Sequence, residues 1–388
     1  WWYDMYGGWF DDPEIYSMIK AAKEEWDKAI EKPVKSNSKI AFVIGDDIIT
    51  TLAYSFDGTY HFLYEALYEQ KESLGHIGTS YDMLYLSDIE DGFAREYDVY
   101  LILATNVTDK QKAAINKYLK KDGKTIIWVG IPGIYGADGS MSVENVSALT
   151  DITLAVAPTS NYGIRIIGNE TYTKGLDGKL YGWIDSTKVD PMFYVNDKSA
   201  ETLGKIYNSD LTGLAVKAVQ TEDGGYYMSI YSAVGNIPEE LLRNILRICG
   251  VKLVESENDV VFRNNTYVSI ASPYGGKKTI EFDGKVDVYD VFKGVYIAKN
   301  VSKVEVETEA GTTLLLRTEK HSKTPDTPDN PDKPDDPSGD SSDKPDSGDN
   351  SGEKDGGCWS AMTFGSALGL LAAISATVVI AMKKRKEN

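Results

Sequence analysis

The chain of 388 residues is acidic, with 59 Asp and Glu against 41 Lys and Arg and a formal net charge of −18. This balance argues against sequence-independent binding to nucleic acid, because contacts to phosphates require many Lys and Arg side chains. Hydrophobic residues make up 42% of the chain, so its folded part has enough apolar side chains for a core, and the length allows two or three domains.

An aromatic run opens the chain, with Trp1, Trp2, Tyr6 and Trp9 beside two glycines. Flat rings suit the C–H faces of sugars, so these residues are candidate carbohydrate contacts. Packing between domains is the alternative interpretation. Asp4 lies in the same run and is a candidate for lining a sugar site or for a local hydrogen bond.

From residue 38 to about residue 136, apolar strands alternate with amphipathic helices. Near-continuous apolar strands separated by helices indicate a parallel sheet that is covered on both faces. The predicted fold class is therefore α/β, with an open parallel sheet of flavodoxin or amidotransferase type. The predicted strands are Lys39–Gly45, Tyr81–Leu86, Tyr97–Ala104 and Lys124–Gly130, and the predicted helices are Thr59–Lys71 and Thr108–Lys121.

The pattern changes twice further along the chain. Residues 143–182 contain short strands and turns, and further strands are predicted at Gly213–Val219 and Tyr226–Ser232. A helix over Pro238–Ile248 follows, and the α/β domain (38–255) ends shortly after it. Residues 256–320 show alternating polarity with regularly spaced turns, which predicts a small all-β sandwich.

Few residues in these domains suit catalysis. Gly45-Asp46-Asp47 follows the first strand, where α/β sheets often bind ligands, but a polar turn is the simpler interpretation and a metal or sugar contact the second. The turn Gly130-Ile131-Pro132-Gly133 lacks the nucleophile that an amidotransferase needs there, and no His-x-Glu sequence is present. We therefore expect neither amidotransferase nor protease chemistry.

Cysteine and histidine are scarce: the chain has two cysteines, Cys249 and Cys358, and three histidines. This inventory provides neither a disulfide framework nor a Cys/His zinc site, so no metal and no cofactor is expected. Cys249 ends an apolar helix and is interpreted as a buried thiol.

The C-terminal part has the composition of a stalk and a membrane anchor. Residues 321–358 are rich in Pro and Asp, which predicts a disordered spacer. Residues 359–388 contain the charge-free run Ser360–Met382, followed by four basic residues, which predicts one transmembrane helix with the preceding domains outside the cell. Because the chain begins with Trp1 and shows no signal peptide, we interpret it as a C-terminal piece or a processed form.

The segment from Gly356 through Ser360, followed by the apolar run and the basic residues, resembles C-terminal anchors of surface proteins from Gram-positive bacteria. The Leu-Pro-x-Thr-Gly sortase signal is missing, which puts covalent attachment to the cell wall in doubt. Cys358 is a candidate processing or modification site, or it is incidental.

A second resemblance covers roughly residues 1–318. The opening run with Asp12-Pro13-Glu14 resembles the last strand and exit helix of the TIM barrel in beta-galactosidase-like glycoside hydrolases of family 42 (residues 1–37). The α/β domain resembles their trimerisation domain, which has a class I amidotransferase-like fold, and the β segment resembles their C-terminal sandwich. The segments that carry these two matches are Pro191–Val195, Gly213–Lys217, Ile237–Arg243 and Gly275–Ile280.

This resemblance implies a non-catalytic role, because the family's two catalytic carboxylates lie on barrel strands that precede this sequence. The leading hypothesis is an accessory and oligomerising C-terminal region, a trimer by resemblance, of a cell-surface hydrolase that acts on carbohydrate. The alternatives are a membrane-anchored carbohydrate-binding or adhesion module without enzymatic activity, and a purely structural surface protein.

Overall fold

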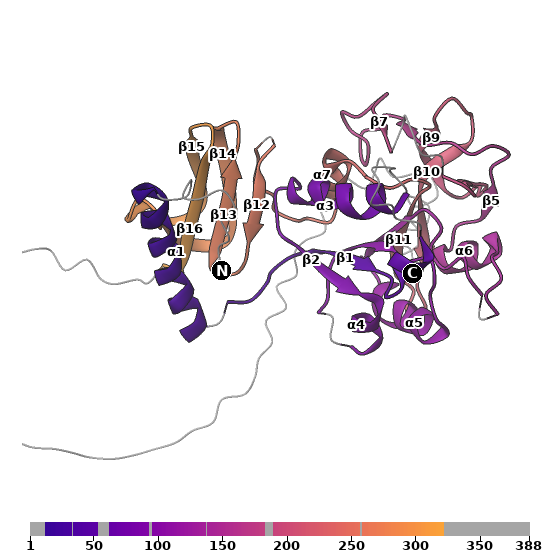
Figure 1. Ribbon diagram of the computed structural model, residues 1–388, viewed down its shortest axis with the longest axis horizontal. Coiled ribbons are helices and arrows are strands. Elements are labelled where there is room, and N and C mark those ends of the chain that lie inside the picture. The colour runs from indigo at the N-terminus through magenta and orange to yellow at the C-terminus, as the bar shows by residue number, and fades with distance from the viewer. Residues whose placement is uncertain are drawn as a thin grey trace, which may run out of the picture.

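The computed structural model describes residues 12–32, 34–52, 62–92, 95–136, 138–182, 189–256 and 258–321. These residues form two lobes (Figure 1). The α/β lobe contains strands β1 to β11 and their helices. The β lobe contains helix α1 (Pro13–Glu31) and strands β12 to β16.

One half of the α/β lobe sheet is parallel, with the strand order β2-β1-β3-β4-β11. Every residue of β1, β3 and β4 is buried, as expected for apolar strands covered on both faces. Helices α3 and α7 lie on one side of this half and α4 and α5 on the other (Figure 1). The strands are β1 (Ile40–Ile44), β2 (Tyr81–Tyr85), β3 (Val99–Leu103), β4 (Thr125–Val129) and β11 (Tyr226–Ser232).

The helical segments of this lobe agree with several sequence predictions. Thr108 caps α5 by accepting a hydrogen bond from the Gln111 amide, so the predicted start of that helix is confirmed. Helix α7 is also confirmed and stops before Gly250, which has a φ of 76°. The segments are α2 (Ile48–Thr51), η1 (Tyr64–Glu69), α3 (Gln70–Gly75), α4 (Leu86–Glu90), α5 (Asp109–Ala114), η2 (Ile115–Leu119), α6 (Val143–Thr150) and α7 (Glu239–Ile248).

The other half of the sheet is antiparallel, so the prediction of an open parallel sheet is wrong. From β11 the order continues β10-β9-β6-β7, and β5 and β8 branch from β10, which gives a mixed sheet of 11 strands. Short turns rather than crossover helices join β9 to β10 and β10 to β11, and short turns permit only antiparallel neighbours. The strands are β5 (Leu154–Val156), β6 (Ile164–Ile166), β7 (Leu180–Tyr181), β8 (Phe193–Val195), β9 (Glu201–Ile206) and β10 (Thr212–Gln220).

The β lobe is a single antiparallel sheet, so the predicted two-sheet sandwich is also wrong. Its five strands are hydrogen-bonded in the order β12-β13-β16-β14-β15. Register shifts between the long strands β14 and β15 mark bulges, which bend strands, and α1 lies against the lobe (Figure 1). The strands are β12 (Val260–Arg263), β13 (Tyr267–Ser272), β14 (Gly276–Asp290), β15 (Val295–Thr308) and β16 (Thr312–Lys320).

No helix within the described ranges is both long and apolar enough to cross a membrane. The transmembrane helix that the sequence predicts belongs to a later part of the chain. That segment, Ser360–Met382, and the predicted stalk beyond His321 lie outside the described residues.

Candidate functional site

A crevice lies at the carboxyl ends of β1 and β3, where the strand order reverses, with β2 on one side of β1 and β3 on the other. Open α/β sheets commonly bind ligands at such a reversal. The two strands stay close up to Gly45, whose amide donates to the Leu103 carbonyl at 2.8 Å. A Cβ at Gly45 would lie 3.1 Å from Cβ of Ala104, so glycine keeps the base of the crevice narrow.

The two carboxylates that the sequence places here accept hydrogen bonds from the segments that follow β2 and β3. Asp46 accepts hydrogen bonds from the Ser87 amide at 3.2 Å, from the Ser87 hydroxyl, and from the Gln111 amide group at 3.0 Å. Asp47 accepts one from Asn106 at 2.9 Å. The two carboxylates therefore hold the starts of α4 and α5 and the loop after β3, which supports the interpretation of Gly45-Asp46-Asp47 as a polar turn.

A cavity of about 580 Å³ opens beside this turn. Its polar lining comes from Thr51, Asn106, Thr108, Asp109, Lys112 and Tyr135. One acid, one base and several hydroxyl or amide groups suit a small polar ligand. They do not form a nucleophile with a base, and across the described ranges no group of three His, Cys, Asp or Glu side chains could hold a metal ion.

Gly130 opens the turn after β4, which is the turn where we looked in the sequence for an amidotransferase nucleophile. Its φ is 68°, and a Cβ there would lie 2.5 Å from Cζ of Phe62. The backbone thus keeps the sharp turn of such a site, while an aromatic ring fills the space that a nucleophilic side chain needs. Neither residue could serve in acyl transfer.

Cys249 is partly buried at the end of α7, with its Sγ 3.5 Å from Oγ1 of Thr125. Burial raises the pKa of this thiol, which keeps it protonated at neutral pH. The structure supports the prediction of a structural thiol, although the side chain is not fully buried.

The residues that the sequence proposed for sugar contact, Trp1, Trp2, Asp4, Tyr6 and Trp9, lie outside the described residues, as does Cys358. The structure therefore does not test those assignments.

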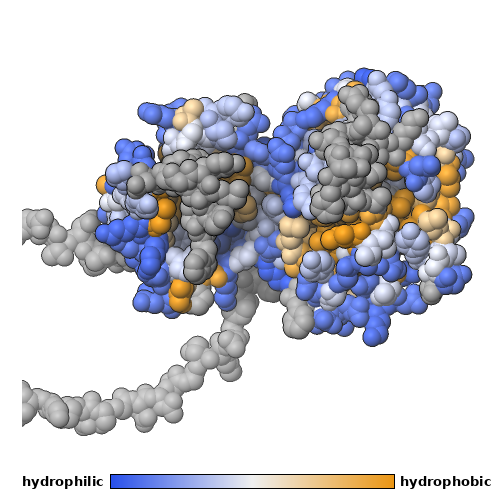
Figure 2. Space-filling model, in the orientation of Figure 1, coloured by the Kyte–Doolittle hydropathy of each residue, from blue (hydrophilic) through white to orange (hydrophobic). Residues whose placement is uncertain are grey.

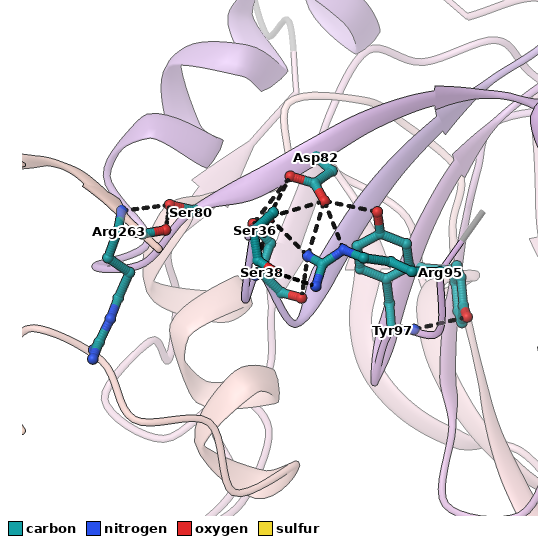
Figure 3. Close-up of polar contacts among 8 residues, drawn as sticks. Ser36, Ser38, Ser80, Asp82, Arg95, Tyr97 and Arg263 are labelled. Atoms are coloured by element: carbon teal, nitrogen blue, oxygen red, sulfur yellow. Dashed lines mark hydrogen bonds and ion pairs between the residues drawn. The ribbon is translucent and has the colours of Figure 1, made fainter. Parts of the chain in front are cut away.

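A polar network at the junction of the lobes was not predicted (Figure 3). The Arg95 guanidinium donates to Asp82 at 2.9 and 3.1 Å and also to the carbonyls of Ser36 and Ser38. The Tyr97 hydroxyl donates to the same carboxylate at 2.7 Å. Burial opposes ionisation of Asp82, but these donors outweigh it and lower the pKa of the carboxyl group.

This network fixes the segment that leads from α1 into β1. Burial, followed by the hydrogen bond to Asp82, raises the pKa of Tyr97 to about 12. On the neighbouring edge, the Ser80 hydroxyl donates to the Arg263 carbonyl at 2.6 Å and accepts from its amide at 2.5 Å (Figure 3). Local sequence gives no signal for these contacts, because their partners come from distant segments.

A second unpredicted cluster joins α1 to the β lobe. Glu25 is only 5% exposed and accepts from Arg317 at 2.5 Å, from Lys28 at 2.6 Å and from the Tyr267 hydroxyl at 3.0 Å. Ala22, Glu25 and Ala29 have the spacing of one helix face and all contribute to the groove between α1 and the sheet. The small residues Ala22 and Ala29 on the same helix face as Glu25 are the sequence signal that could have indicated that Glu25 faces the sheet.

The flank of α1 beside this groove is apolar and largely exposed among the described residues, and its Trp26 and Ile30 also line the groove. Trp26 is 69% exposed and Ile30 65%, and Tyr16 and Ile19 are also exposed. Figure 2 shows hydrophobic atoms between hydrophilic ones over the position of α1. Surface helices normally place polar residues on the outward face, so this face has the composition of a contact surface.

Comparison with known proteins gives a fold likeness. No protein-family model and no curated protein sequence matches the chain. The beta-galactosidase from Bacillus circulans sp. alkalophilus is similar with a TM-score of 0.55 and 13% identity, over 78% of this chain and 45% of that one. The beta-galactosidase from Rahnella sp. R3 is similar with a TM-score of 0.52 and 10% identity, over 79% and 45%.

A third solved structure, Gan42B, a GH42 beta-galactosidase from G. stearothermophilus, gives a TM-score of 0.52 and 12% identity, over 79% of this chain and 44% of that one. This chain thus spans less than half the length of each of these enzymes. At such low identity the likeness concerns the fold alone: the two lobes have the architecture of part of a GH42 beta-galactosidase.

Proposed function

We propose that this chain is a non-catalytic, accessory region of a glycoside hydrolase that acts on carbohydrate. The observation that carries the proposal is the combination of a GH42-like partial fold with an apolar face on α1 that is exposed among the described residues.

The apolar face of α1 would pack against the catalytic domain of the hydrolase. The matched part of the three solved beta-galactosidases is less than half of each chain, so the remainder of such an enzyme is available as the covering domain. Tyr16, Ile19, Trp26 and Ile30 supply large apolar side chains, and burying such a side chain contributes about 1.5–3 kcal/mol. The Glu25 cluster would hold the helix in place for this contact.

Turnover of aryl β-galactosides and of plant oligosaccharides by the purified chain tests the proposal. We expect no activity above that of the heat-denatured chain. Turnover that follows the folded protein through gel filtration would defeat the accessory role. The resemblance to the family also implies a trimer, which light scattering coupled to gel filtration measures directly.

The second candidate is a carbohydrate-binding or adhesion module that works without any enzyme. The aromatic run at Trp1, Trp2, Tyr6 and Trp9 favours it, since these rings suit sugar faces. This candidate predicts sugar binding by the isolated chain that weakens in Trp2→Ala and Trp9→Ala. Binding that is unchanged in both variants would exclude the aromatic run as the contact.

We further propose that the two lobes face the outside of the cell. The support is in the sequence alone: the charge-free run Ser360–Met382 is followed directly by four basic residues. Protease treatment of intact cells should remove the lobes. Protection of the lobes until the membrane is permeabilised would contradict this location.

A further inference from the structure

A groove of about 840 Å³ separates the α/β lobe from the β lobe. One wall is α7, with Arg243, Asn244 and Arg247, and the loop at Lys174. The other wall is the turn that leads into β14, with Tyr274 and Lys277. This volume is within the range of ligand pockets and is large enough for several sugar rings.

Tyr274 presents an open aromatic face from a rigid turn. It is 75% exposed, the most exposed of the large hydrophobic side chains described. The turn is fastened by hydrogen bonds from the Gly311 amide to the Ser272 carbonyl at 2.9 Å and from Lys278 to the Gly275 carbonyl at 2.6 Å. At Gly275, with a φ of 73°, a Cβ would lie 2.7 Å from the Ala310 amide nitrogen, so the turn sits tightly on its neighbour.

The base of the same turn is a buried ion pair. Lys278 and Asp259 are almost inaccessible, and their charged atoms are 2.8 Å apart. Removing one partner of such a pair is costly, because it leaves the other charge buried and uncompensated. The position of Tyr274 is therefore set by the fold before any ligand binds.

The facing wall has more positive than negative charge. Arg243 and Arg247 share one carboxylate, Glu255, at 3.2 and 2.7 Å. Burial, and then the positive charge of the neighbouring Arg247, lower the pKa of Arg243. Lys174 forms no ion pair within the described part of the chain, so this wall has three cations, and the two arginines have a single carboxylate between them.

The remaining charges of the groove are already balanced. Lys277 pairs with Glu305 at 2.7 Å, and Glu240 pairs with Lys179 at 2.5 Å. The excess of positive charge is thus local to Arg243, Arg247 and Lys174, in a chain whose formal net charge is −18. An anionic group would offset this excess, and the planar guanidinium of Arg247 suits a carboxylate or sulfate.

We propose that this groove binds an acidic oligosaccharide, with a sugar ring on Tyr274 and an acidic substituent on the wall of Arg247 and Lys174. The carbohydrate class rests on the proposed function, whereas the requirement for an anion rests on the charges of the groove. The site is separate from the crevice at β1 and β3 and from the apolar face of α1.

Calorimetric titration of the full chain with trigalacturonate, galactotriose and hexaglutamate tests the proposal. We expect saturable binding of trigalacturonate. This binding should weaken when the ionic strength of the assay is raised from about 0.05 to about 0.5 M, because salt screens exposed charges. Galactotriose should bind about tenfold more weakly or not at all, since it lacks the anion. Hexaglutamate should not bind, since it lacks the sugar ring.

Substitutions on each wall locate the contact. Tyr274→Ala should weaken trigalacturonate binding about fivefold to tenfold, because it removes the aromatic contact. Arg247→Gln should weaken it about tenfold, and Lys174→Gln about threefold, with a smaller salt dependence in both. Tyr296→Ala is the matched control, since Tyr296 is an exposed tyrosine beside Lys299 that does not line the groove, and it should bind as the unchanged chain does.

Four results would overturn the inference: no binding of trigalacturonate, equal binding of hexaglutamate, equal binding of galactotriose, or equal losses in Tyr296→Ala and Tyr274→Ala. None of these results changes the outcome of the turnover assay, so failure of this inference is distinguishable from failure of the proposed accessory role.

Discussion

The two lobes are held together in different ways. The α/β lobe has a continuous apolar core in which β1, β3 and β4 are buried along their whole length. The β lobe has a smaller core around nine buried side chains and adds the polar cluster of Glu25, Arg317 and Tyr267, which holds α1. Apolar burial thus dominates the first lobe, whereas the second adds directional contacts, and one apolar face of its helix is exposed among the described residues.

The largest expected effect comes from Trp128→Ala in the core of the α/β lobe. Trp128 is fully buried and donates its indole N–H to Ser229 at 3.0 Å. The cavity and the lost hydrogen bond should lower the free energy of unfolding by about 3–5 kcal/mol. Urea unfolding followed by circular dichroism measures this. A loss below about 1 kcal/mol would contradict a tightly packed core.

Glu25→Gln should have the next largest effect and should act on the β lobe. It removes the charge that binds Arg317 and Lys28, and we expect a loss of about 2 kcal/mol. Hydrogen exchange should show faster opening of α1 while β1 and β3 remain protected. Glu24→Gln, at the neighbouring exposed position, is the control and should leave both regions unchanged.

The Glu25 cluster should also respond to pH. Burial opposes ionisation of Glu25, but hydrogen bonds from Lys28, Arg317 and Tyr267 outweigh it and lower its pKa from 4.5. A lowered folded-state pKa means that the carboxylate stabilises the protein above pH about 4.5 and loses this contribution as the pH falls through the folded-state pKa. The difference in the free energy of unfolding between the unchanged chain and Glu25→Gln should therefore shrink as the pH falls below about 4.5. A constant difference from pH 7 to pH 3 would exclude this mechanism.

Asp82→Asn tests the junction between the lobes. It weakens the acceptor for Arg95 and Tyr97, and we expect a loss of about 1–2 kcal/mol. The effect should be smaller at high salt, because Asp82 and Arg95 are partly exposed. Thermal unfolding at two ionic strengths measures it, and an undiminished loss at high salt would show that the ion pair is not its cause.

The smallest effect on stability should come from Trp26→Glu on the outer face of α1. Because Trp26 is exposed, the free energy of unfolding should change by no more than about 0.5 kcal/mol. Binding of a fluorescent apolar dye should nevertheless fall, since the uncovered face loses its largest ring. Phe262→Glu, an exposed residue on β12, is the control outside α1. A large loss of stability in Trp26→Glu would show that the ring is part of the β lobe core.

The sequence was most informative where apolar runs are continuous and helices carry caps. The first strands of the α/β lobe and the start of α5 at Thr108 followed from local pattern, because a strand covered on both faces leaves an uninterrupted apolar run. The direction of the later strands was not predictable in the same way. Short strands show few alternations, and only the pairing of β9, β10 and β11 reveals that they are antiparallel.

For the candidate site too, the sequence identified positions but not the contacts between distant segments. The sequence identified Gly45-Asp46-Asp47 and the turn at Gly130 as the positions to examine, but not that Asp46 is held by Ser87 and Gln111. Nor did it indicate that Tyr274 faces Arg247 across a groove, since these residues belong to different lobes. The positions Trp1, Trp2, Asp4, Tyr6 and Trp9 stay predictions.

By itself, the sequence determined the buried strands, the helix starts, the lack of an amidotransferase nucleophile and the acidic charge of the chain. These properties depend on residue type and on short-range spacing, which the chain carries before it folds. The tertiary structure decided the mixed sheet, the single-sheet β lobe, the Glu25 cluster and the groove between the lobes. Each of these depends on contacts between residues far apart in sequence, such as Glu25 with Arg317, and only folding brings such residues together.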